Sequence, residues 1–259
     1  MGTCGSKKRS KAVVQEHRLS SLFGEKPLLS LPELEQYYSN VHILVLPKVR
    51  TLYQEVVSRR TEGVQELSLQ FTPLGEVQAV PLARVIVFYP DLRTLRLWKT
   101  KLGAGGMRAI AEALPKLEML ESLGLEDNGL GDEGMISLAE GIRPLSRLKE
   151  LFLQINTISD TGLRTLISGL IDKASITTLN FSENRLTVNS LSVLLEACGA
   201  TLKLLDLAQN SLGPEGAKLL SDWLPRLNRL EKLRIGGNGL GDEAERELMT
   251  VAGRVQVLL

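Results

Sequence analysis

An α/β solenoid, built from repeated strand–helix units, is the fold class that the sequence predicts. Leucine accounts for 51 of the 259 residues, whereas aromatic residues make up only 4%. A leucine motif returns seven times at a nearly constant spacing, and a segment with helical periodicity follows each copy. A core made mostly of one aliphatic side chain at a fixed period indicates one packing solution used many times.

The motif has leucine or another apolar residue at its first, fourth, sixth and eleventh positions and Asn or Thr at its ninth. Its copies begin at residues 64, 92, 120, 148, 176, 202 and 230, so the spacing is 28 residues with a single exception of 26. The fourth and sixth positions have the period of a strand, so both side chains point inward. The Asn amide can bond backbone groups where the strand turns away, and stacked copies then form a ladder.

A helix is predicted after each turn, because Gly134, Leu138 and Ile142 recur at i, i+4 and define one buried face. We expect an aspartate to be the N-cap in three of the repeats, namely Asp132, Asp160 and Asp242. One strand and one helix cannot bury their own core, so neighbouring repeats must stack.

Residues 64–259, which contain the seven copies, resemble the ribonuclease-inhibitor type of leucine-rich repeat. The resemblance covers about three-quarters of the chain. It implies a horseshoe with parallel strands on the concave face and α-helices on the convex face. It is nearly silent on function, because this fold serves many unrelated partners.

The ends of the array are less regular. We interpret residues 19–63 as an atypical N-terminal capping region, with a strand at 41–46 and a helix at 51–59. At the other end, Leu258 follows Leu230 by 28 residues, where an eighth repeat is expected to start.

Residues 1–18 form a basic tail with a net charge of +4, against −3 for the remaining 241 residues. Its first residues match the N-myristoylation pattern, with Gly2 as acceptor, and Cys4 is a candidate for palmitoylation. Four basic residues follow and are expected to contact an anionic membrane, namely Lys7, Lys8, Arg9 and Lys11. The tail is similar to the N-termini of acylated flagellar-membrane proteins of protists. The alternatives are a plain basic tail and a nuclear-targeting run.

Catalytic and cofactor chemistry is not expected. The two histidines, His17 and His42, have no partner at catalytic or metal-ligand spacing, and Cys198 lies in a repeat helix as a buried structural thiol. The net charge of +1 argues against nucleic-acid binding by phosphate neutralisation. Two cysteines are too few for a disulfide framework, so we expect a reduced, intracellular compartment.

Strand alternation predicts a binding surface, because the third, fifth, seventh and eighth positions point to the concave side. Large side chains there, Trp98 and Phe152 above all, have no use in the core. The residues predicted to contact a protein partner are Arg96, Trp98, Glu126, Phe152, Gln154, Asp206, Lys232 and Arg234. The alternative is that Trp98 covers the irregular first repeats and Phe152 is incidental.

The sequence therefore predicts a non-catalytic scaffold or adaptor that binds an unidentified protein at the cytoplasmic side of a membrane, with a cilium or flagellum as one setting. The alternative is a GTPase activator, because activators of the nuclear-transport GTPase share this repeat type. Those activators carry a longer array and an acidic tail after it, which this sequence does not show before Leu259.

Replacement of Gly2 tests the tail. We expect the natively expressed protein to carry a myristate-sized mass increase and to sediment with membranes, and Gly2→Ala to lose both. Intact mass and membrane fractionation are the measurements. An unmodified N-terminus with equal distribution of both proteins would reduce residues 1–18 to a basic tail.

Overall fold

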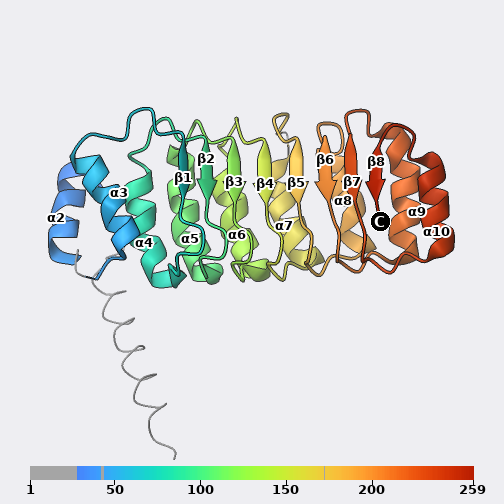
Figure 1. Ribbon diagram of the computed structural model, residues 1–259, viewed down its shortest axis with the longest axis horizontal. Helices are drawn as coiled ribbons and strands as arrows, with labels where there is room; N and C mark the ends of the chain where they lie inside the picture. Colours follow the sequence, from blue (N-terminus) through green and yellow to red (C-terminus); the bar gives the residue numbers. More distant parts are fainter. Residues whose placement is uncertain (1–27, 42–43, 172) are drawn as a thin grey trace, which may run out of the picture.

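The computed structural model describes residues 28–41, 44–171 and 173–259. Within these residues, eight short strands form one parallel sheet in sequence order, and helices cover one of its faces (Figure 1). The strands are β1 (Glu66–Ser68), β2 (Thr94–Arg96), β3 (Ser122–Gly124), β4 (Glu150–Phe152), β5 (Thr178–Asn180), β6 (Leu204–Asp206), β7 (Lys232–Arg234) and β8 (Gln256–Leu258). The helices are α2 (Leu31–Val41), α3 (Pro47–Val57), α4 (Gly75–Ile86), α5 (Gly103–Ala113), α6 (Gly131–Ile142), α7 (Asp160–Leu170), α8 (Val188–Cys198), α9 (Gly213–Trp223) and α10 (Asp242–Val251).

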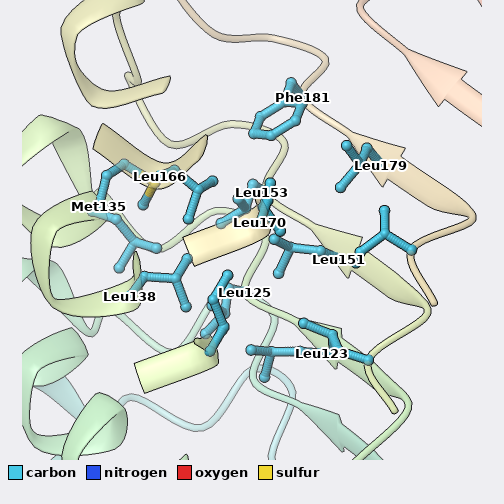
Figure 2. Close-up of a cluster of buried hydrophobic side chains, with 14 of the residues drawn as sticks. Leu123, Leu125, Met135, Leu138, Leu151, Leu153, Leu166, Leu170, Leu179 and Phe181 are labelled. Atoms are coloured by element: carbon cyan, nitrogen blue, oxygen red, sulfur yellow. The ribbon is translucent and has the colours of Figure 1, made fainter. Parts of the chain in front are cut away.

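The register of the sheet equals the repeat spacing from β1 to β7. Leu123 pairs with Leu151 and Leu151 with Leu179, so equivalent leucines stack in one line. These side chains are fully buried and meet leucines of α6 and α7, as Figure 2 shows. The single 26-residue repeat keeps the alignment, with Leu179 opposite Leu205. The predicted α/β solenoid of stacked strand–helix units is confirmed.

A ladder of buried asparagines joins the repeats at the ends of the strands. The amide nitrogen of Asn156 donates to Leu153 O in its own repeat and to Leu125 O in the preceding one, both at 3.0 Å. Its Oδ1 accepts from the backbone N–H groups of Asn128 and Leu130. Asn128, Asn184, Asn210 and Asn238 bond in the same way. Each amide thus satisfies backbone groups of two repeats, as the motif predicts.

The expected aspartate N-caps are wrong. The N-cap of α7 is Ser159, whose side chain accepts from Thr161 N, and the residues before α6 and α10 make no side-chain cap. Asp132 instead lies inside the first turn of α6, because the chain turns through a left-handed Gly131 at φ 57°. From there its carboxylate accepts from Ser159 N in the next repeat, at 2.8 Å.

Asp160 repeats this arrangement one unit later and accepts from Thr187 N at 2.9 Å and from the Ser190 hydroxyl. Asp242 follows Gly241 as the first residue of α10. The aspartates of α6 and α7 therefore link successive repeats, and they lie near helix N-termini, where negative charge is favourable.

The strand expected at 41–46 is also wrong over the residues that the structure describes there. Val41 ends α2, and residues 44–46 form a turn before Pro47 begins α3, four residues earlier than expected. The side chain of Gln78 accepts from Leu46 N at 3.1 Å and donates to Leu44 O at 3.0 Å. Because these backbone groups bond to a glutamine of α4, they need no neighbouring strand.

Tyrosine side chains attach the two N-terminal helices to the array. Tyr38 stacks on Tyr53 at a centroid distance of 3.9 Å and donates to Pro81 O. Tyr89 donates to Glu55 Oε2 at 2.8 Å, and Arg84 lies 4.4 Å over the ring of Tyr37. All four tyrosines of the chain therefore lie at this junction, which sequence periodicity did not indicate.

The last strand has a different spacing from the one expected. Val257, in the middle of β8, pairs with Leu233 after 24 residues, and Leu258 pairs with Arg234. Leu258 is therefore on the outward side of the sheet and does not occupy the place of Leu230. The shorter spacing follows from the direct turn between the end of α10 at Val251 and β8.

Close contacts between helices depend on small residues. A Cβ at Gly169 of α7 would lie 2.4 Å from Ala139 O in α6, which is backbone and cannot turn aside. We expect Gly169→Ala to lower the free energy of unfolding by about 1–3 kcal/mol, as overpacking does. Urea denaturation measures the change.

Gly105→Ala is the matched control, because its new Cβ would meet only the mobile carboxylate of Glu76. We expect this helix substitution to be neutral or to stabilise by up to about 1 kcal/mol. Equal losses in both variants would show that close helix approach is not the cause.

Candidate protein-binding surface

The strand face is defined here as the solvent side of the sheet, which carries the fifth and seventh positions of each repeat. The leucines between them point inward and are fully buried from β2 to β7. The fifth positions are Ser68, Arg96, Gly124, Phe152, Asn180, Asp206 and Arg234. The seventh positions are Gln70, Trp98, Glu126, Gln154, Ser182, Ala208 and Gly236. Backbone hydrogen bonds keep both rows aligned across the sheet.

The structure brings five of the eight predicted contact residues together on β2, β3, β4 and the residues that follow them. These five are Arg96, Trp98, Glu126, Phe152 and Gln154. The other three, Asp206, Lys232 and Arg234, lie on β6 and β7, beyond β5. Asp206 is buried and bonds Arg234 at 3.3 Å and Ala208 N at 3.1 Å, so its carboxylate is used within the sheet.

Apolar side chains surround the first group. Trp98 is 37% exposed, and its ring lies 4.6 Å from that of Phe71, which is 59% exposed. Ile155 is 38% exposed two strands away, beyond the half-buried Phe152. The contact residues Phe71 and Ile155 were not predicted individually. Both stand at the eighth position of their repeats, which strand alternation had already assigned to this side.

The eighth positions adopt a left-handed backbone in six successive repeats. Phe71, Lys99, Asp127, Ile155, Glu183 and Gln209 have φ between 50° and 59°, and the seventh repeat has Gly237. This conformation costs a residue other than glycine about 1 kcal/mol and is rare for a β-branched one. Ile155 is therefore both strained and exposed, which the stability of the fold does not require.

Glu126 is the least satisfied charged group on the strand face. Its Oε2 is buried, and no described residue donates a hydrogen bond to it. Burial raises the pKa of this carboxyl, while its own backbone N–H and the charge of Arg96 act in the other direction. The carboxylate lies against Gly124, where an added Cβ would stand only 2.8 Å from Oε2. The glycine thus leaves room for a charge that the fold itself does not neutralise.

Other candidate chemistry is placed as follows. Cys198 is buried, as predicted, and burial raises the pKa of its thiol to about 12. In the part of the chain that the structure describes, no group of three or more His, Cys, Asp or Glu side chains could hold a metal ion. None of the helices described is long and apolar enough to cross a membrane. Gly2, Cys4, Lys7, Lys8, Arg9 and Lys11 lie outside the described residues.

The buried carboxylate predicts a pH-dependent gain in stability for Glu126→Gln. The raised folded-state pKa means that ionisation costs more in the fold than in the unfolded chain. The cost is absent below the unfolded value of about 4.3 and is complete above the folded one. We expect the variant to have a higher Tm at pH 7 and an unchanged Tm near pH 3. A lower Tm at pH 7 would mean that the carboxylate stabilises the fold.

Comparison with known proteins agrees with this architecture. A family model described as a leucine-rich repeat matches residues 116–139 and 200–221, which overlap the third and sixth repeats. No curated protein matches the chain. Domains of this class generally serve as protein-interaction scaffolds. With one parallel strand per repeat, helices on the opposite face and an asparagine ladder between units, the chain is an α/β leucine-rich repeat solenoid.

Proposed function

We propose that this protein is a non-catalytic scaffold that binds a protein partner on the strand face, centred on β2 to β4. An acylated N-terminal tail would hold it at the cytoplasmic side of a membrane. The observation that carries the binding proposal is the exposed aromatic pair of Phe71 and Trp98 beside Glu126. The tether rests on the residues of the tail alone.

The physical argument is that these side chains cost stability without serving the core. Phe71 and Ile155 place apolar surface in water on a left-handed backbone, and Glu126 holds a buried charge. Aromatic side chains near the centre of an interface are the usual anchors of protein binding, with effects of about 2 kcal/mol or more when truncated. A partner that covers this region would bury the apolar surface and supply the missing hydrogen bonds.

The double variant Trp98→Ala/Phe152→Ala tests the proposal. We expect it to keep the Tm of the parent within a few degrees, because neither side chain belongs to the leucine core. Partners cross-linked to the parent chain would be identified and purified, and their affinities measured. We expect the double variant to lose at least about thirtyfold in affinity.

Ile136→Ala is the matched control, since Ile136 is an exposed apolar residue of α6 on the helix-covered side. It should bind like the parent. Equal binding by the double variant would contradict a strand-face site, and loss of binding by the control alone would move the site to the helices. GTP hydrolysis by the nuclear-transport GTPase, stimulated by the purified chain, would favour the activator alternative.

A further inference from the structure

The centre of the strand face contains two adjacent oxygen acceptors without donors. Glu126 and Gln154 occupy the seventh positions next to β3 and β4, and Asp127 N donates to Gln154 O between them. Neighbouring strands are about 4.8 Å apart, so the two side chains lie side by side. Glu126 Oε2 and Gln154 Oε1 are both buried, and no described residue donates to either.

The surroundings of these oxygens are open and aromatic. Gly124 lies between Arg96 and Phe152 in the fifth row, so a gap replaces the side chain there. Trp98 flanks Glu126 in the seventh row, and Phe152 is its diagonal neighbour across the gap. A gap over glycine, bordered by aromatic rings and ending at a carboxylate, is shaped for one inserted side chain.

The charges of the face show which sign is missing. Four charged residues occupy the fifth and seventh rows, and three of them already have ionic partners within the sheet. Arg96 bonds Glu66 at 3.1 Å, and Asp206 bonds Arg234. Lys99 at the eighth position is likewise paired, with Asp127 at 3.2 Å. Glu126 has no ion pair within hydrogen-bonding distance among the described residues, so the group that it lacks is a cation.

We propose that this gap binds an arginine side chain of the protein partner, an inference that rests on the function proposed above. A guanidinium presents five N–H donors in one plane. It can therefore bond the Glu126 carboxylate and the Gln154 oxygen together while its face lies on the ring of Trp98. An apolar side chain would leave both oxygens unpaired, and an acidic one would be repelled. A lysine ammonium is a compact point charge without the planar fork.

The test uses defined peptides and the indole N–H signal of Trp98, identified by its loss in Trp98→Phe. The chain has two tryptophans, so the assignment is direct. The probe is acetyl-Gly-Arg-Gly-amide at millimolar concentrations. Otherwise identical peptides with citrulline or lysine remove the charge or the planar fork. We expect the arginine peptide to shift the Trp98 signal saturably and to bind at least about tenfold more tightly than the citrulline peptide.

Glu126→Gln keeps the shape of the side chain and removes its charge, and we expect it to weaken the arginine peptide at least about tenfold. Glu183→Gln is the matched control, an exposed carboxylate at the eighth position after β5, and it should bind like the parent.

No shift with the arginine peptide, equal binding of the citrulline or lysine peptide, or an unaffected Glu126→Gln variant would each overturn the assignment. Each of these results leaves the scaffold proposal standing if Trp98→Ala/Phe152→Ala still loses its partner.

Discussion

The stacking of one repeat on the next is the constraint on which the rest of the structure depends. A strand of three residues and a helix of about eleven cannot enclose a core, so every buried leucine needs the neighbouring unit. The asparagine ladder holds the units in register, because Asn156 bonds backbone groups of its own repeat and of the preceding one. With the register held, the outward side chains stand in straight rows, and a binding surface can be made by substitutions at single positions.

The strand face shows how such a scaffold can carry function at little risk to its fold. Its outward positions are independent of the leucine core, so Trp98 and Phe152 need not serve packing. Glu126 goes further, since it keeps a buried charge whose Oε2 no described residue supplies with a donor. Groups that lower stability in a rigid framework are commonly retained for binding, because interactions with the partner offset their cost. The proposed arginine contact follows from that unsatisfied acceptor and from the neighbouring charges, all of which already have partners.

Where the sequence analysis failed, local rules had been applied to contacts between units. Asp132 looks like an N-cap in one dimension, but the left-handed Gly131 moves it into the helix and toward Ser159 of the next repeat. Apolar residues at 41–46 resemble a strand, yet Gln78 of α4 satisfies the backbone there. Phe71 was overlooked because its importance comes from the ring of Trp98, 28 positions away in phase. In each case the deciding partner belongs to another repeat, and a local pattern contains no information about it.

The sequence by itself determined the class of fold, the seven strand positions and the faces on which side chains lie. It could do so because strand alternation and the asparagine position repeat with a fixed period, and the same physics acts in every copy. Only the tertiary structure decided which outward residues are available. Asp206 and Glu126 are both acids in outward rows, but one is paired with Arg234 and the other has no ion partner. That difference depends on the neighbouring strands, since Arg96 bonds Glu66 and the glycine at position 124 leaves the space open.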